Sequence, residues 1–172
     1  MREKFNQLGF NSAPLGAPKL TRPVDGVGAS NEFAGRLRKR MKSPIPLRHL
    51  FLFDIKETGS DKHQEYTGVP TAPIHASLFA LDQAGAKIIL RCPIIPRLND
   101  REDHFHTIAA LANQLKNVQA INILPYHPLG EGKLKRLGKN ETWTASGFAE
   151  ADTVANWVNA VQAQTEVLVE ER

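Results

Sequence analysis

The sequence predicts an α/β protein built around a parallel sheet. From residue 50 onward, short apolar segments typical of strands alternate with longer segments in which apolar residues recur at helical spacing. Strands that alternate with helices pair in parallel through right-handed crossover connections. Only three to four strands are expected, which is too few for a closed barrel. The predicted strands are therefore expected to form part of a larger parallel sheet.

The first half of this region predicts a strand, a helix and a second strand. Leu50 to Ile55 is a continuous apolar run, which is typical of a strand buried in a parallel sheet. A helix is expected over 73–84, followed by Gly85 at the position of a left-handed C-terminal cap. The second strand is expected over 87–92, where Pro93 stops it.

The second half predicts a helix, a strand, a further helix and a short last strand. Asn99 or Asp100 is expected to cap the first of these helices, which runs to about Lys116. The other three elements are expected over 118–124, where Pro125 breaks the strand, over 148–164 and over 166–169.

Residues 1–49 differ in composition from the rest. They hold ten Lys and Arg against three Asp and Glu, a net charge of +7, whereas residues 50–172 hold 12 against 15, a net charge of −3. They also hold five prolines and five glycines and show no periodic apolar pattern. Such a segment buries too little apolar surface to offset its ordering entropy, so we expect a disordered leader. One hypothesis is that this leader is foreign to the fold and comes from a truncated, frameshifted or misannotated reading frame.

Several classes of protein are disfavoured by the same composition. No apolar run approaches membrane-spanning length, and no signal-type apolar core follows the first residues, so we expect a cytoplasmic protein without membrane contact. The basic run over 36–42 lacks a recognisable fold and interleaved aromatic residues, so nucleic-acid binding is the least favoured function. Cys92 is the only cysteine, so the chain forms no internal disulfide, and we expect this residue in the core.

Polar residues follow the ends of three predicted strands. Asp54 and Lys56 end the first, Arg91 lies at the end of the second, and His127 follows the third. Ligands gather at the carboxyl ends of parallel strands, so these four residues predict a rim for an anionic ligand such as an amino-acid carboxylate, with Asp54 available for an ammonium group or a cation. The alternative interpretation remains open: Asp54 and Lys56 form a strand-end ion pair, and His127 is a turn residue.

The four strand-end residues lie within a series of four sequence segments. They read FLFDIK at 51–56, KHQEYTGV at 62–69, ILRCPIIPRLND at 89–100 and LPYHPLGEGKLKRLG at 124–138. In this order and spacing they resemble the carboxyl-terminal half of the glycyl-radical enzyme activating proteins, a family of the radical S-adenosylmethionine superfamily that includes activases of pyruvate formate-lyase. Four blocks in order are far more specific than any one of them.

The resemblance implies a radical S-adenosylmethionine partial barrel. In that family a [4Fe-4S] cluster cleaves S-adenosylmethionine, and the resulting radical takes a hydrogen from a glycine of the partner, a glycyl-radical enzyme of the pyruvate formate-lyase or dehydratase type. Carried over by position, Asp54 and Lys56 match a motif that serves cofactor and cation binding. Arg91 matches an arginine near the methionyl group, and His127 matches a histidine beside the nucleoside. The basic loop over 133–139 is either solvated or part of the face that meets the partner.

One departure from the family is as informative as the match. The family binds its cluster through Cys-x-x-x-Cys-x-x-Cys in the amino-terminal half, and a lone cysteine cannot supply three thiolates. We therefore expect no cluster on this chain alone, no metal site and no catalytic residue, so that activity would need a separate cluster-bearing half. The alternative is a non-catalytic docking module for a glycyl-radical enzyme. Missing strands would also leave Leu50 to Ile55 with an unpaired edge, which predicts marginal folding and aggregation.

The remaining histidines are expected to have no metal-binding role. His104 and His106 lie two residues apart on a predicted helix, so their side chains point to different faces. His63 and His75 are isolated in the sequence and are expected to be solvated.

Overall fold

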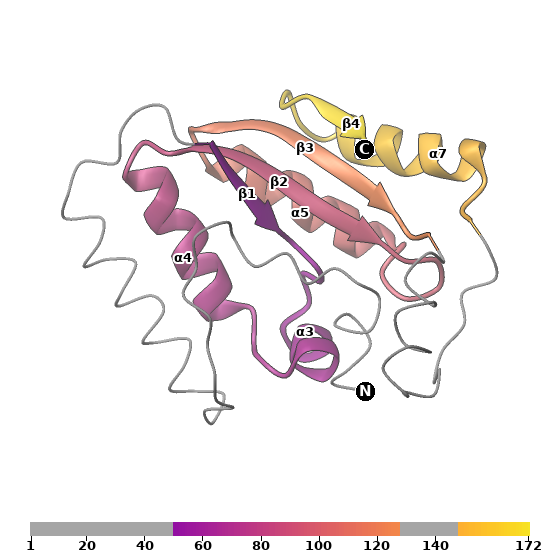
Figure 1. Ribbon diagram of the computed structural model, residues 1–172, viewed down its shortest axis with the longest axis horizontal. Coiled ribbons are helices and arrows are strands. Elements are labelled where there is room, and N and C mark those ends of the chain that lie inside the picture. Colours follow the sequence, from indigo (N-terminus) through magenta and orange to yellow (C-terminus); the bar gives the residue numbers. More distant parts are fainter. Residues whose placement is uncertain (1–49, 128–147) are drawn as a thin grey trace, which may run out of the picture.

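The computed structural model describes residues 50–127 and 148–172, and the expected leader and the 133–139 loop lie outside these ranges. The described elements, in chain order, are β1 (Leu50–Asp54), α3 (Ser60–Thr67), α4 (Ala72–Gln83), β2 (Lys87–Ile94), α5 (Glu102–Gln114), β3 (Val118–Pro125), α7 (Ala151–Gln162) and β4 (Val169–Glu171). The four strands form one sheet in the order β1-β2-β3-β4, and all neighbours are parallel (Figure 1). The predicted α/β class with three to four parallel strands is confirmed.

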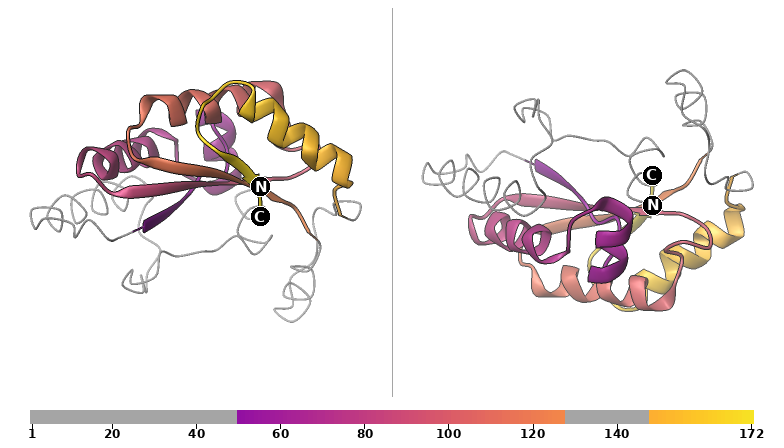
Figure 2. Two further views of the ribbon diagram at one scale, coloured as in Figure 1. Left: turned by 90° about the horizontal axis from the view of Figure 1, so that it is seen from above. Right: turned by 90° about the horizontal axis from the view of Figure 1, so that it is seen from below.

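Helices α4, α5 and α7 pack on one face of the sheet (Figure 2). Because side chains alternate along a strand, every second strand residue faces these helices. The completely buried strand residues on this face are Ile88, Leu90, Cys92, Ile94, Ile121 and Ile123. The helices contribute buried apolar side chains of their own, among them Leu78, Ile108, Trp157 and Val161. The hydrophobic core therefore lies between the sheet and its helices.

The opposite face of the sheet, called here the open face, carries no described helix (Figure 2). Leu50 and Leu52 on β1 point to this face and are 51% and 54% exposed. Among the described residues β1 pairs with β2 alone, so β1 is an edge strand. The expected open edge at β1 is thus present in the described part of the chain.

Two prolines that were expected to stop strands lie inside them instead. The backbone carbonyl of Arg91 accepts a hydrogen bond from Ile55 N, so the backbone of Arg91 points toward β1. The backbone of Pro93, two residues later, points toward β1 as well. Because β1 ends at Asp54, the missing N–H of Pro93 removes no strand-to-strand hydrogen bond, and β2 continues to Ile94. Similarly, β3 ends on Pro125, one residue later than predicted.

One helix was not predicted, and two others begin later than expected. Helix α3 was not predicted, because its sequence is polar and only His63 and Tyr66 are buried. Helix α5 begins at Glu102, since the side chain of Asn99 is engaged elsewhere and caps no helix. Helix α7 begins three residues later than expected. The last strand lies at Val169–Glu171, shifted from the predicted 166–169.

Candidate functional site

A row of polar side chains crosses the open face of the sheet. Its members stand directly opposite one another in the strand register, one from each strand: Asp54, Arg91, Asn122 and Glu170. Directly paired residues of parallel strands point to the same face. The residues that flank Arg91 and Asn122 are completely buried on the helix side. The alternation along each strand therefore places these four side chains, called here the polar row, on the side without helices.

Asp54 and Arg91 are joined at one end of this row. Arg91 Nε lies 3.7 Å from Asp54 Oδ1, and the two side chains are 27% and 16% exposed. Partial burial strengthens the attraction relative to a pair on the surface, because less water screens the charges. The structure thus brings together two of the four residues that the sequence predicted as a rim.

Lys56 lies two residues after β1, partly buried, and belongs to the same electrostatic environment. Burial lowers the pKa of its ammonium group, and the negative charge of Asp54 opposes this effect. Asp54 therefore influences both cations, although the ion pair described above joins it to Arg91. A partly desolvated cation beside a carboxylate–guanidinium pair suits the binding of an anionic group.

His127 is the fourth predicted residue, and it follows β3, whereas the other three lie on or just after β1 and β2. It follows β3 by two residues and is exposed, whereas its neighbour Tyr126 is buried and donates its backbone N–H to the carbonyl of Ile94. Within the described ranges, no hydrogen bond or ion pair joins His127 to Asp54, Lys56 or Arg91.

A buried asparagine connects the ends of β1 and β2. Asn99 is completely buried; its Nδ2 donates to the carbonyl oxygens of Lys56 at 2.9 Å and Pro93 at 2.8 Å, and its Oδ1 accepts from Ile95 N at 2.7 Å. These three hydrogen bonds fix the backbone of Lys56 relative to β2. Sequence reasoning identified Asn99 only as a helix cap, because its partners lie too far along the chain to be inferred.

A buried ion pair lies directly after Lys56. Glu57 has a fully buried side chain that accepts hydrogen bonds from Thr58 N, Gly59 N and Arg101 Nη2, the last at 2.9 Å. Its partner Arg101 is 44 residues away in the sequence. Three donors compensate a carboxylate that would otherwise be costly to bury. This pair, which no sequence pattern indicated, holds the loop after β1 against the start of α5.

His104 completes this buried cluster. Its Nδ1 lies 2.9 Å from Thr58 Oγ1 and 3.7 Å from Glu57 Oε1, and its Nε2 is buried without a partner in the described part of the chain. Burial lowers its pKa to about 4, while the nearby Glu57 acts in the opposite direction. His104 is therefore neutral at pH 7.

The other histidines differ in their surroundings. His106 is exposed, so the prediction that His104 and His106 face different ways is confirmed. His63 was expected to be solvated, which is wrong: it is 5% exposed, and its Nδ1 lies 2.6 Å from the carbonyl of Val69. Its partners are local, and the polar sequence of α3 concealed its burial.

Cys92 lies on the core face of β2 and is completely buried. Burial raises the pKa of its thiol, which disfavours the thiolate that metal ligation requires. The prediction of a core cysteine is confirmed. Over residues 50–127 and 148–172, no three His, Cys, Asp or Glu side chains gather in a way that could hold a metal ion.

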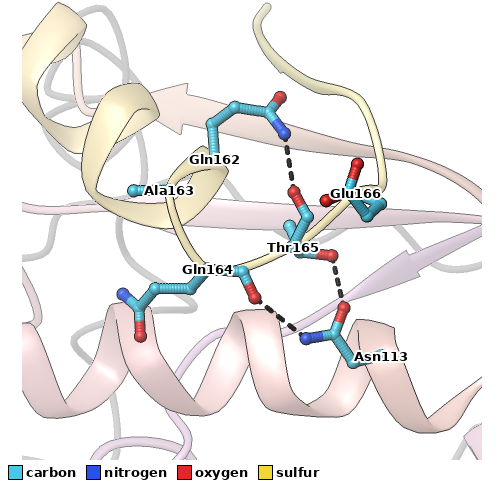
Figure 3. A pocket seen from close by; sticks show the side chains of 6 residues that line it. All are labelled: Asn113, Gln162, Ala163, Gln164, Thr165 and Glu166. Carbon is cyan, nitrogen blue, oxygen red and sulfur yellow. Dashed lines mark hydrogen bonds between the residues drawn. The ribbon is translucent and has the colours of Figure 1, made fainter.

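A shallow polar pocket of about 460 Å³ lies where α5 and α7 end. Its lining residues already bind one another: Asn113 Nδ2 donates to the carbonyl of Gln164, and Thr165 Oγ1 donates to Asn113 Oδ1 (Figure 3). Because α5 returns from the carboxyl ends of the strands to their amino ends, this pocket lies near the amino ends. Lys56 lies near the carboxyl ends. Its satisfied hydrogen bonds indicate a structural contact between the two helices.

No described helix is long and apolar enough to cross a membrane. No protein-family model matches the chain.

Individual proteins do resemble it in sequence. The chain is 33% identical over 129 residues to the benzylsuccinate synthase activating enzyme of Thauera aromatica, covering 73% of this chain and 39% of that protein. It is 35% identical over 138 residues to the pyruvate formate-lyase-activating enzyme of Staphylococcus epidermidis, covering 80% of this chain and 52% of that protein. The chain thus spans roughly two fifths to one half of the length of these curated relatives.

Two solved structures share the fold. One is a domain of a pyruvate-formate lyase-activating enzyme from Bacteroides vulgatus, with a TM-score of 0.56 and 17% identity, covering 88% of this chain and 96% of that one. The other is a radical SAM methyltransferase from Sphaerobacter thermophilus, with a TM-score of 0.57 and 12% identity, covering 81% of this chain and 37% of that one. The predicted fold, an incomplete (β/α) barrel, is confirmed by these two matches. In sequence, the chain is a partial homologue of the glycyl-radical enzyme activating enzymes.

Proposed function

We propose that this chain supplies the carboxyl-terminal half of the S-adenosylmethionine site of a glycyl-radical enzyme activating enzyme, in the cytoplasm, and that it has no activity by itself. The observation that carries this proposal is the joining of Asp54 and Arg91 on the open face, beside the partly buried Lys56. The sequence similarity to two activating enzymes over more than 70% of this chain supports the assignment of the ligand.

The residues fit the amino-acid part of such a ligand. The guanidinium of Arg91 and the ammonium of Lys56 would bind its carboxylate, and Asp54 would bind its ammonium group or a cation. His127 would lie beside the nucleoside, as its resemblance to the family's histidine implies. When bound in a complete enzyme, S-adenosylmethionine would supply the group that takes a hydrogen atom from the partner's glycine.

The residues do not fit the [4Fe-4S] cluster. Such a cluster needs three protein thiolates, and the chain contains only Cys92. That thiol is completely buried among core side chains and is held in its neutral form by burial. We therefore assign the cluster ligands to a separate cluster-bearing half.

Isothermal titration calorimetry, in which S-adenosylmethionine is titrated into the full chain, tests the binding part of the proposal. The wild-type chain should bind, and Arg91→Gln should bind at least tenfold more weakly. The charge-matched control Lys116→Gln should bind like wild type, because Lys116 is exposed just before β3, at the amino ends of the strands. A wild-type chain that does not bind would overturn the proposal.

Anaerobic reconstitution tests the catalytic part. With iron and sulfide, the purified chain should form no cluster and release no 5′-deoxyadenosine from S-adenosylmethionine. Turnover by the chain alone would show that its cluster ligands are not thiolates of this polypeptide.

A non-catalytic docking module for a glycyl-radical enzyme is the second candidate. It is favoured by the same buried cysteine, because docking needs no cluster. Binding to pyruvate formate-lyase or a related dehydratase without any affinity for S-adenosylmethionine would support this function over the first. Nucleic-acid binding would rest on the basic run over 36–42, which lies outside the described residues.

A further inference from the structure

The polar row contains one member that sequence reasoning did not identify. Asn122 lies in the middle of β3, directly opposite Arg91 on β2 and Glu170 on β4. Adjacent parallel strands lie about 4.8 Å apart, so the side chain of Asn122 projects from the open face between a guanidinium and a carboxylate. Glu170 is itself engaged, since Arg172 donates to its Oε2.

Asn122 is an unfavourable residue for its position. Asparagine is depleted in strands, and the flanking residues on β3 are the apolar Ile121 and Ile123, both completely buried. The Oδ1 atom of Asn122 is buried and has no hydrogen-bond partner within the described ranges. A buried carbonyl oxygen without a donor destabilises the folded state, so its presence calls for an explanation.

Other buried or half-buried amides in this protein show the contrast. Asn99 uses both ends of its side chain in three hydrogen bonds. Asn117 donates from Nδ2 to the backbone and the carboxylate of Asp82. The asparagines with a structural role thus have hydrogen-bond partners within the described part of the chain. Asn122 differs from them because its side chain lies on the open face, where the ligand is proposed to bind.

We propose that Asn122 is a further binding residue for S-adenosylmethionine, and that Asn122 Oδ1 accepts a hydrogen bond from an N–H or O–H group of the ligand. This inference rests on the proposed function, since it uses the same open face. Arg91, next in the row, attracts the anionic group of the ligand. An amide oxygen accepts hydrogen bonds, so Asn122 would recognise a donor group of the ligand.

A single substitution separates this role from a structural one. Asn122→Val removes the acceptor and places a strand-favouring residue on β3. Calorimetric titration of the full chain with S-adenosylmethionine should give a Kd that is about fivefold to tenfold higher, the effect of one lost hydrogen bond. Thermal unfolding of the unliganded variant should give a Tm equal to or higher than that of wild type, because no buried acceptor is left without a donor.

The matched control is Gln119→Val, which replaces an exposed amide on the same strand and should leave the Kd unchanged. Wild-type affinity in Asn122→Val would overturn the inference and leave the proposed function intact. A lower Tm with weaker binding would also overturn it, because Asn122 would then have a structural role. A wild-type chain without affinity would overturn the proposed function and this inference together. Asn122→Ala repeats the measurement should the valine variant fail to fold.

Discussion

Asn99 Nδ2 lies 2.9 Å from the carbonyl oxygen of Lys56, and this hydrogen bond ties the second residue after β1 to the segment that follows β2. The same side chain also binds Pro93 and Ile95, so one buried amide sets the relative position of two strand ends. The proposed ligand site is formed at these ends. Its geometry therefore depends on a residue that contacts no ligand.

Replacement of Asn99 should destabilise the protein strongly. Asn99→Leu would remove the buried hydrogen bonds to the Ile95 N–H and the Pro93 carbonyl and the part-buried one to the Lys56 carbonyl, which should cost about 2–4 kcal/mol of unfolding free energy. Urea denaturation followed by circular dichroism measures this loss. The control Asn156→Leu changes an exposed residue of α7 and should cost far less. Equal stability of the two variants would contradict the importance assigned to these hydrogen bonds.

Stability should fall as the pH drops from about 6.5 to about 4. His104 has a pKa lowered to about 4 by burial, against an ordinary value of 6.5, so the unfolded chain binds the proton more tightly over this range. Protonation thus favours unfolding, by up to about 3 kcal/mol once the pH reaches the folded pKa. Urea denaturation at several pH values measures the slope.

His104→Gln should flatten this pH dependence, whereas His106→Gln, at an exposed position, should leave it unchanged. Some dependence should remain in His104→Gln, because burial also lowers the pKa of His63. A steep slope of unchanged size in His104→Gln would assign the effect to other groups.

The single thiol should be unreactive in the folded protein. Cys92 is completely buried and its pKa is raised by burial, so both access and the thiolate fraction are reduced. Ellman's reagent should label it only after addition of denaturant, at a rate that follows unfolding. Rapid stoichiometric labelling of the native chain would contradict its core position and would reopen the question of a ligand role.

The open edge of the sheet should promote self-association. Leu52 is 54% exposed on β1, which is an edge strand among the described residues, and edge strands pair readily with other chains. Leu52→Lys should reduce self-association in sedimentation velocity experiments without loss of stability, because a charged side chain blocks edge pairing. The control Phe148→Lys replaces a side chain that is 64% exposed outside the sheet. An equal effect of both variants would indicate general hydrophobic aggregation and not pairing at β1.

Sequence reasoning worked where the signal is local. Apolar runs located the three long strands, and helical spacing located α4, α5 and α7 to within a few residues. Helix α3 escaped because it has no apolar stripe, and Pro93 was misleading because its effect depends on which neighbouring strand is present at that register. Residue types at strand ends selected Asp54, Lys56 and Arg91 as candidate binding residues. They did not decide whether Asp54 forms its ion pair with Lys56 or with Arg91.

The sequence by itself determined the fold class, the kinship with activating enzymes and the lack of cysteines for a cluster, because these follow from local periodicity, ordered motifs and residue counts. Only the tertiary structure decided that Arg91 pairs with Asp54, that Glu57 is buried against Arg101, and that Asn122 lies in the polar row. The physical reason is that strand register and long-range hydrogen bonds join residues tens of positions apart. Such contacts form from the packing of the whole sheet and leave no periodic trace in the chain.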